Sequence, residues 1–200
     1  MFKNLYSLNV FYSNIEGIDN KELTRICVAA ASRKAASVKS NTGYTDVPVD
    51  GTNKEIIRLR KTIKSVMHEH IDQRLVEAEM WTHVMQPGET TMIHSHRNKL
   101  DWGFLGLSWV YYPQMPEGEN IGGKIIYQIQ IGGIKTINKD FTPKTGMFII
   151  FPSWLPHFST RCTSQETRIS ISGNYRFNDE RLYDEVAHDP NSGIKKLTGF

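Results

Sequence analysis

The sequence predicts a mainly β protein that carries helices in its N-terminal part, and three observations support this prediction. From about residue 78 to 177, short stretches rich in β-branched and aromatic residues alternate with turns that contain glycine or proline. Ahead of this region, residues 54–75 place apolar side chains at the spacing of an amphipathic helix. The 200 residues suffice for one domain with a full core. We expect a single domain over 1–200, with a strand and supporting helices in 1–77, a β core in 78–177 and a C-terminal tail in 178–200.

The N-terminal part is expected to begin with a strand and a helix. Residues 5–15 have the composition of a strand, and residues 19–36 carry apolar side chains at helical spacing, with Asp19 or Asn20 as the N-cap. Residues 37–53 are rich in glycine, proline, asparagine, aspartate, serine and threonine, which is typical of a loop.

A second helix is predicted with more support than the first. Thr52 and Glu55 have the spacing of a capping box, which marks a helix N-terminus. The apolar stripe needs a sheet to cover it, and its members are Ile56, Leu59, Ile63, Val66, Met67, Ile71 and Leu75. His68 and His70 also lie on this helix, but residues two apart on a helix point in different directions, so we do not expect them to share a ligand.

The β region is expected to contain eight short strands, a number typical of a sandwich or a barrel. The predicted strands cover residues 80–86, 90–94, 105–112, 124–131, 136–138, 147–152, 157–161 and 168–175.

The overall composition argues against several classes of protein. The net charge of +3 is small and evenly spread, which argues against a nucleic-acid partner. No apolar run reaches the length of about 20 residues that a membrane helix needs, and no signal peptide is visible. Cys27 and Cys162 have no metal-type spacing and fit free thiols of a reducing compartment. We therefore expect a cytoplasmic protein without a membrane partner, and a homo-oligomer stays open.

Three histidines form a candidate metal site. His94 and His96 are two residues apart in a predicted strand, so their side chains point to the same face and can bind one ion. His157 follows the apolar run 147–151 and can supply a third ligand from a distant strand. The alternative is that His94 and His96 are half-buried and hydrogen-bonded to neighbours. His83 is expected to be a packing histidine on its strand.

The same region resembles the Fe(II)/2-oxoglutarate-dependent dioxygenase superfamily, and more narrowly a group of mostly uncharacterised bacterial and phage oxygenases. The resemblance covers residues 81–175 and implies a double-stranded β-helix, a jelly-roll or cupin-like barrel, with the helices packed on one sheet. It rests on four motifs, which are His94-x-His96, Ser108-x-Val110-Tyr111-Tyr112, Phe151-Pro152-Ser153-Trp154-x-x-His157 and Arg168-x-Ser170-x-Ser172-x-Asn174.

The resemblance implies roles for individual residues. His94 and His157 match the two histidines that bind Fe(II), and Arg168 matches the arginine that holds the distal carboxylate of 2-oxoglutarate through its planar guanidinium. Ser170 is placed to add a hydroxyl to that carboxylate, and Tyr112 matches a phenol that contacts the keto acid. The implied reaction couples decarboxylation of 2-oxoglutarate to hydroxylation of an unidentified substrate, either a small molecule or a protein side chain.

This sequence departs from the family pattern at one ligand. The usual motif is His-x-Asp or His-x-Glu, and here His96 stands at the acidic position. Either the site has three histidines or a carboxylate from elsewhere completes it, with Asp101 as the best substitute. We favour His96, because strand geometry directs it to the same face as His94.

A second hypothesis keeps the fold and changes the function. Gly88, the His94-x-His96 pair and Asp101 also fit the first cupin motif, and Gly146, Pro152 and His157 fit much of the second. A cupin would be a metal enzyme without a cosubstrate or a binding module, and three histidines can also bind zinc. A third hypothesis is a jelly roll with a vestigial site. Arg168 separates these alternatives, because a cupin has no need of an anion-binding arginine there.

The substrate cannot be identified from the sequence. The candidates for the mouth of the site are Trp102, Phe104, Trp109 and Trp154, although aromatic residues in such folds are more often core. Residues 97–106 are a candidate substrate lid.

Overall fold

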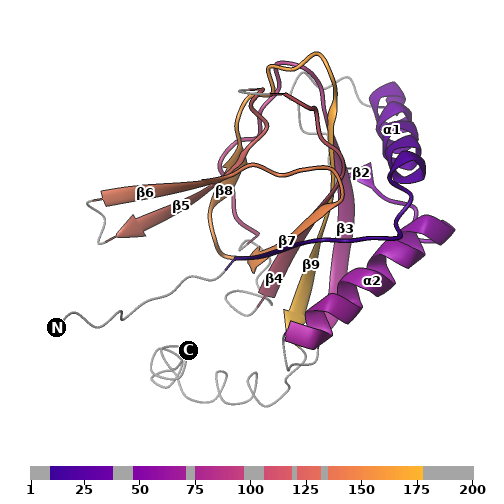
Figure 1. The fold of residues 1–200 in the computed structure, drawn as a ribbon, viewed down its shortest axis with the longest axis horizontal. Coiled ribbons are helices and arrows are strands. Elements are labelled where there is room, and N and C mark those ends of the chain that lie inside the picture. The colour runs from indigo at the N-terminus through magenta and orange to yellow at the C-terminus, as the bar shows by residue number, and fades with distance from the viewer. Residues whose placement is uncertain are drawn as a thin grey trace.

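Two β-sheets and two helices make up the part of the chain that the computed structural model describes, namely residues 10–37, 47–70, 75–96, 106–118, 121–131 and 135–177 (Figure 1). The larger sheet has six strands in the order β1-β7-β4-β9-β3-β2, and the smaller sheet has three in the order β6-β5-β8. Every strand pair is antiparallel, as the alternating patterns in the sequence predict.

The strands of the six-stranded sheet are β1 (Phe11–Asn14), β7 (Met147–Pro152), β4 (Gly106–Gln114), β9 (Arg168–Phe177), β3 (Leu75–Met85) and β2 (Val47–Pro48). Those of the smaller sheet are β6 (Lys135–Phe141), β5 (Ile125–Ile131) and β8 (His157–Ser159). A mainly β architecture with helices in the N-terminal part is therefore confirmed.

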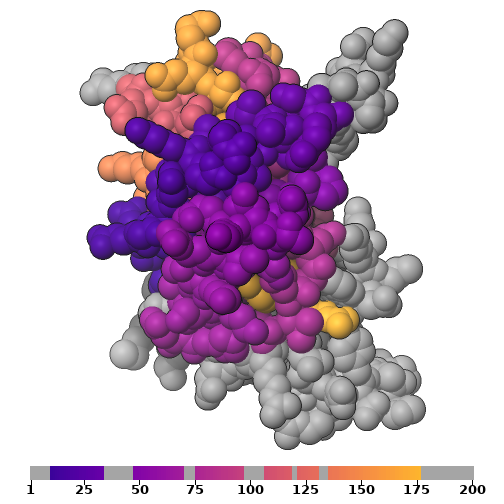
Figure 2. Space-filling view, turned by 90° about the vertical axis from the view of Figure 1, so that its right-hand side faces the viewer, coloured from indigo at the N-terminus to yellow at the C-terminus, as the bar shows by residue number. Residues whose placement is uncertain are grey.

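The two helices, α1 (Asn20–Ser37) and α2 (Lys54–His70), cover one face of the six-stranded sheet (Figures 1 and 2). Their apolar faces are buried against that sheet, and each large side chain removed from water contributes about 1.5–3 kcal/mol. The helix side chains in this core are Leu23, Ile26, Cys27, Ile56, Leu59, Ile63 and Met67. The sheet contributes Trp109, Tyr111, Phe148, Ile150, Ile169, Ile171 and Tyr175. Trp109 is thus a core residue and not part of a substrate mouth.

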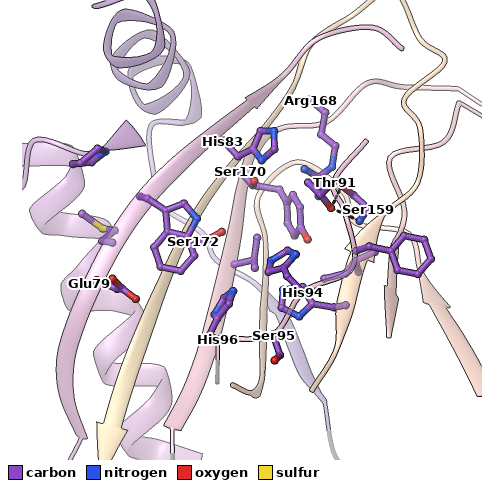
Figure 3. A pocket seen from close by; sticks show the side chains of 18 residues that line it. Glu79, His83, Thr91, His94, Ser95, His96, Ser159, Arg168, Ser170 and Ser172 are labelled. Atoms are coloured by element: carbon purple, nitrogen blue, oxygen red, sulfur yellow. Dashed lines mark hydrogen bonds between the residues drawn. The ribbon is translucent and has the colours of Figure 1, made fainter. Parts of the chain in front are cut away.

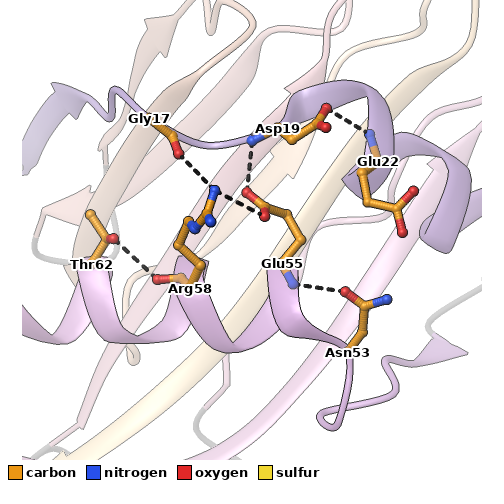
Figure 4. A network of polar contacts seen from close by, with 7 residues as sticks. All are labelled: Gly17, Asp19, Glu22, Asn53, Glu55, Arg58 and Thr62. Atoms are coloured by element: carbon orange, nitrogen blue, oxygen red, sulfur yellow. Dashed lines mark hydrogen bonds and ion pairs between the residues drawn. The ribbon is translucent and has the colours of Figure 1, made fainter.

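Hydrogen bonds join the starts of the two helices, and an ion pair within α2 belongs to the same network (Figure 4). Asp19 caps α1, because its Oδ1 accepts from the backbone N–H of Glu22 at 3.0 Å. The predicted Thr52–Glu55 capping box is replaced by Asn53, whose Oδ1 accepts from the Glu55 N–H at 2.8 Å. The Glu55 carboxylate instead accepts the Asp19 N–H at 2.7 Å and pairs with Arg58 at 3.3 Å. One acidic side chain therefore ties α2 to the beginning of α1.

A second apolar cluster fills the space between the two sheets. Its buried members are Val110, Tyr112, Met115, Ile125, Tyr127, Met147, Ile149, Phe151 and Leu155. The six-stranded sheet is therefore covered on both faces, by helices on one side and by the smaller sheet on the other.

Strand β3 contains a β-bulge between Glu77 and Glu79. Glu77 pairs with Tyr175 and Glu79 pairs with Asn174, so Ala78 is an extra residue without a partner on β9. Residues two apart in a regular strand share a face, but this bulge places Glu77 and Glu79 on opposite faces. Glu77 forms an ion pair with Arg60 of α2 at 2.7 Å, while Glu79 lines the cavity described below.

Several predicted boundaries were wrong. Helix α2 ends at His70, and Leu75 begins β3 instead of continuing the helix. Residues 90–94 do not form a ladder strand, because within the described part of the chain their backbone makes a single bridge, between His94 and His157 of β8. The predicted strand over 5–15 is observed as Phe11–Asn14, and its first residues lie outside the described part of the chain.

Two expectations about membranes and thiols can also be compared with the structure. No helix among the described residues has the length and apolar character that crossing a membrane requires. Cys27 and Cys162 are both buried free thiols. Burial raises the pKa of the Cys27 thiol to about 11, which makes it an unreactive core residue.

Candidate functional site

A cavity of about 680 Å³ lies on the inner face of the six-stranded sheet (Figure 3). Alternate side chains of three neighbouring strands form its wall, as the two-residue period of a strand requires. They are Glu79, Trp81 and His83 from β3, Arg168, Ser170 and Ser172 from β9, and Val110 and Tyr112 from β4. The opposite wall consists mainly of Thr91, His94, Ser95 and His96, followed by His157, Phe158 and Ser159.

Three histidines meet in this cavity. One ring nitrogen each from His94, His96 and His157 lie within 4.8 Å of one another. The ring centroids of His94 and His157 are 4.3 Å apart, and those of His96 and His157 are 5.1 Å apart. The backbone brings them together, because His94 and His157 form an antiparallel bridge and the His96 N–H donates to Ser153 O at 2.9 Å.

The hydrogen bonds of His94 and His157 engage Nδ1 of each ring and leave Nε2 available to bind a metal. His94 Nδ1 lies 2.8 Å from Met92 O, and His157 Nδ1 lies 2.9 Å from Leu155 O. A carbonyl oxygen only accepts, so each Nδ1 carries the hydrogen and each Nε2 carries a lone pair. Burial, reinforced by His94 and His96, lowers the pKa of His157 well below its ordinary value, which favours the neutral ring that binds metals.

His96 is oriented by side chains instead of a backbone carbonyl. Its Nδ1 lies 2.7 Å from Ser108 Oγ and 2.8 Å from Asn174 Oδ1. The Trp81 ring meets the imidazole edge-on, with a centroid separation of 5.2 Å. The three rings together fit a divalent metal ion that prefers imidazole ligands.

A buried cation lies in the same cavity as the histidines. Arg168 is only 4% exposed, and its Nε donates to Gly123 O at 3.1 Å. The guanidinium carbon is 5.1 Å from the centre of the Tyr112 ring. Within the described residues no carboxylate forms an ion pair with Arg168. A buried guanidinium without an acidic partner is suited to an anionic ligand.

Two glycines hold this arginine in place. Gly122 and Gly123 have φ angles of +72° and +67°, which side chains rarely adopt. A Cβ on Gly122 would collide with the carbonyl oxygen of Arg161, and a Cβ on Gly123 would lie 3.1 Å from Arg168 Cδ. The glycine pair therefore allows the backbone to approach Arg168 closely enough to accept its hydrogen bond.

Comparison with protein families identifies the β region. The family model described as "Putative 2OG-Fe(II) oxygenase" matches residues 79–174, which contain all the cavity residues named above. This segment of the chain is therefore similar to the 2OG-Fe(II) oxygenase family. No curated protein matches the chain.

Solved structures similar to this chain share its fold. A prolyl-4-hydroxylase from Pseudomonas putida matches with a TM-score of 0.61 and 16% identity, covering 85% of this chain and 89% of that one. A prolyl hydroxylase from Trichoplax adhaerens, in complex with a peptide of hypoxia inducible factor, matches with a TM-score of 0.62 and 14% identity, covering 86% and 84%. HygX from Streptomyces hygroscopicus, with nickel and 2-oxoglutarate bound, matches with a TM-score of 0.61 and 11% identity, covering 84% and 83%. The double-stranded β-helix is thereby confirmed.

The structure brings two further predicted site residues, Ser170 and Tyr112, to the same cavity. Ser170 lines the wall on the strand that carries Arg168. The buried hydroxyl of Tyr112 lies near the guanidinium, which partly offsets the rise in the pKa of this phenol that burial causes. Asp101, the alternative ligand to His96, lies outside the described residues, as do Trp102, Phe104 and most of the expected lid.

Sequence analysis missed the roles of three residues of the site, namely Glu79, His83 and Asn174. His83, expected to be a packing residue, lines the cavity opposite Ser170 in the β3–β9 register and is 6% exposed. Burial, and then the charges of Arg168 and His94, lower its pKa to about 4. Asn174 belongs to a recognised motif, but its contact with His96 follows only from the strand register. Glu79, Trp81 and His83 are two residues apart in a strand and so share one face, and this spacing is the signal that could have revealed Glu79 and His83.

Proposed function

We propose that this protein is a 2OG-Fe(II) oxygenase that hydroxylates an unidentified substrate at a metal held by His94, His96 and His157, with 2-oxoglutarate anchored by Arg168. One observation carries this proposal. The buried guanidinium of Arg168 has no carboxylate partner among the described residues, and it lies in the same cavity as the three converging imidazoles. Bound Fe(II), with 2-oxoglutarate and O2, supplies the oxidising chemistry of this enzyme class. The protein supplies ligands, orientation and a cavity that limits access of water.

The residues of the cavity have distinct tasks in this proposal. Arg168 binds the distal carboxylate through its two terminal nitrogens, since Nε is already engaged by Gly123. Ser170 and Tyr112 lie beside the guanidinium and provide hydroxyl groups to the same ligand. His83 remains neutral near neutral pH, so it contributes a polar wall without a second positive charge.

The cavity is large enough for more than the cosubstrate. Pockets for small molecules range from about 300 to 1,000 Å³, and this one is about 680 Å³. We assign the part of the cavity that is lined by Pro48 of β2 and Trp81 of β3 to the substrate. Both a small molecule and a side chain of a protein fit this description.

The cupin alternative is disfavoured by one specific feature. A metal site without a cosubstrate gives no reason to keep a buried arginine close to the metal ligands. Burying an unpaired cation costs several kcal/mol unless a ligand compensates for it, so Arg168 is a poor structural choice in a cupin that binds no anion.

The decisive experiment is an anaerobic titration of the Fe(II)-loaded protein with 2-oxoglutarate, observing the metal-to-ligand charge-transfer absorption band. The band should develop in the unmodified protein. In Arg168→Ala the affinity should fall by roughly 2–5 kcal/mol, because the carboxylate is left desolvated and unpaired. Arg168→Lys should be intermediate, since it keeps the charge and loses the planar geometry. Arg60→Ala is the matched control, because Arg60 lies on the helix side of the same sheet and pairs with Glu77.

Each outcome of the titration has a clear meaning. If Fe(II) binds and no band develops at any 2-oxoglutarate concentration, the cosubstrate assignment is wrong and the cupin alternative replaces it. If Arg168→Ala binds 2-oxoglutarate as tightly as the unmodified protein, the anchor is wrong although the enzyme class stands.

A further inference from the structure

Three polar side chains form a row across the central strands beside His96. They are Glu79 on β3, Asn174 on β9 and Ser108 on β4, and the strand register pairs Asn174 directly with both of the others. The bulge at Ala78 is what directs Glu79 to this face, because Glu77 on the other side of the bulge points to α2. A charged residue and an amide are therefore built into the sheet behind the predicted third metal ligand.

The hydrogen bonds along this row have only one consistent direction. The Glu79 carboxylate can only accept, so Asn174 must present Nδ2 to it, and the two atoms are 2.9 Å apart. Asn174 Oδ1 then faces His96 Nδ1 at 2.8 Å. Two acceptors cannot approach so closely without a hydrogen between them, so Nδ1 carries the hydrogen. Ser108 Oγ donates to the same Oδ1 at 2.8 Å and reinforces its orientation.

His96 differs from the other two histidines in how its ring is fixed. The backbone carbonyl two residues earlier orients His94, through Met92, and His157, through Leu155. For His96 the partners are side chains, namely Ser108 Oγ and Asn174 Oδ1, and the Asn174 amide is oriented in turn by Glu79. Because a serine hydroxyl can either donate or accept, the tautomer of His96 is selected by Asn174 of β9 and, through it, by Glu79 of β3.

We propose that Glu79 and Asn174 are positioning residues that fix His96 as the Nδ1–H tautomer with Nε2 toward His94 and His157. This inference rests on the proposed three-histidine centre and deepens it. The acidic ligand that the family motif usually supplies is absent at position 96, and Glu79 provides a negative charge two hydrogen bonds behind the imidazole instead. Such partners orient metal ligands and increase their basicity.

The test measures the tautomer in metal-free protein by long-range ¹H–¹⁵N NMR of the histidine rings, which distinguishes a protonated from an unprotonated nitrogen. His96 should be the Nδ1–H tautomer in the unmodified protein. Asn174→Leu removes the acceptor and should shift His96 toward a mixture of tautomers. Glu79→Gln should do the same, because the new amide can donate to Asn174 Oδ1 and allow the Asn174 amide to turn. Both variants should also weaken Co(II) binding by about 10- to 100-fold in competition with a chelating dye.

Two controls separate this effect from general damage to the strands. Glu77→Gln makes the same chemical change two residues away on the helix side of β3, and Ser172→Ala removes a hydroxyl from the cavity one row away on β9. Neither should alter the His96 tautomer. Glu79→Gln keeps the proposal testable if Asn174→Leu fails to fold.

The proposal is overturned if His96 keeps the Nδ1–H tautomer and full Co(II) affinity in folded Glu79→Gln and Asn174→Leu, or if the Glu77→Gln control changes the tautomer equally. This failure differs from that of the proposed function. The tautomer is measured without iron or cosubstrate, whereas the proposed function fails when iron-loaded protein does not bind 2-oxoglutarate.

Discussion

His94 and His157 hold each other through their backbones, with His94 N–H donating to His157 O at 3.0 Å and His157 N–H donating to His94 O at 2.8 Å. A pair of residues that exchange both hydrogen bonds in an antiparallel bridge place their side chains on the same side. Two histidines far apart in the sequence therefore face one another before any metal is present. The conformational entropy of ordering these ligands is lost when the protein folds and not when the metal binds.

The first prediction concerns metal binding by this pair. His94→Ala and His157→Ala should each abolish stoichiometric Fe(II) or Co(II) binding, because each removes one of the converging imidazoles. Metal analysis after gel filtration measures the loss. His68→Ala is the matched control, since His68 is exposed on α2. Retention of the ion by both cavity variants would rule out this metal centre.

The second prediction decides the third ligand. His96→Ala should weaken Co(II) binding by at least about 10-fold, the size of effect known for weaker perturbations around metal sites, while Asp101→Ala should leave the affinity unchanged. Competition with a chelating dye gives both values. The opposite result, a loss in Asp101→Ala alone, would make the carboxylate the ligand and His96 a bystander.

The third prediction concerns the glycines beneath Arg168. Gly122→Ala should destabilise the protein by about 1–3 kcal/mol, the usual range for a strained backbone conformation. It should also weaken 2-oxoglutarate binding, because relieving the collision with Arg161 moves the Gly123 carbonyl that orients Arg168. Urea denaturation and the anaerobic titration measure the two effects. Gly88→Ala is a useful comparison, since Gly88 also has a positive φ but no atom near the added Cβ. Equal cosubstrate affinity in Gly122→Ala would separate the glycines from the anchor.

The fourth prediction is a dependence of stability on pH that originates from His83. Its pKa is lowered from 6.5 to about 4 in the folded protein, chiefly by burial. The unfolded chain therefore binds the proton more readily, and the stabilising contribution, complete above about pH 6.5, is lost as the pH falls toward about 4. At about pH 4.5 this single group should cost about 2–3 kcal/mol. Urea denaturation of the metal-free protein at about pH 7 and pH 4.5 measures the loss.

A variant isolates the contribution of this histidine. His83→Leu cannot titrate, so its free energy of unfolding should decrease by about 2–3 kcal/mol less than that of the unmodified protein over the same pH range. Parallel decreases in the two proteins would show that other groups cause the acid sensitivity.

The repeating patterns of the sequence predicted much of the fold. The spacing of Ile56, Leu59, Ile63 and Met67 correctly indicated α2, and the apolar run 147–152 coincided with β7. The segment 90–94 was wrongly predicted to be a strand, because it has the composition of one although the described backbone pairs it with β8 through a single bridge. The end of α2 was misplaced at Leu75 because an apolar residue at the right spacing also serves as the first residue of a strand.

The site residues that belong to sequence motifs were predictable, whereas those whose direction depends on the pairing register of the strands were not. His94, His96 and His157 were predicted from their spacing and Arg168 from the family resemblance, and the structure places all four in one cavity. Glu79 and His83 were not found, because their direction depends on how β3 aligns with β9. A bulge of one residue changes that alignment, and no composition or periodicity marks Ala78 as the residue without a partner.

The bulge at Ala78 has a consequence for how this protein can change. Deleting Ala78 would restore the regular alternation of β3 and turn Glu77 and Glu79 to the same side. Either Arg60 would then lose its ion pair with Glu77, or Asn174 would lose its hydrogen bond to Glu79. The ion pair that attaches α2 and the hydrogen bond behind His96 could then not both form from these two strand positions. An insertion of one residue allows them to vary independently, and homologous sequences should accordingly tolerate substitution of Ala78 but not its loss.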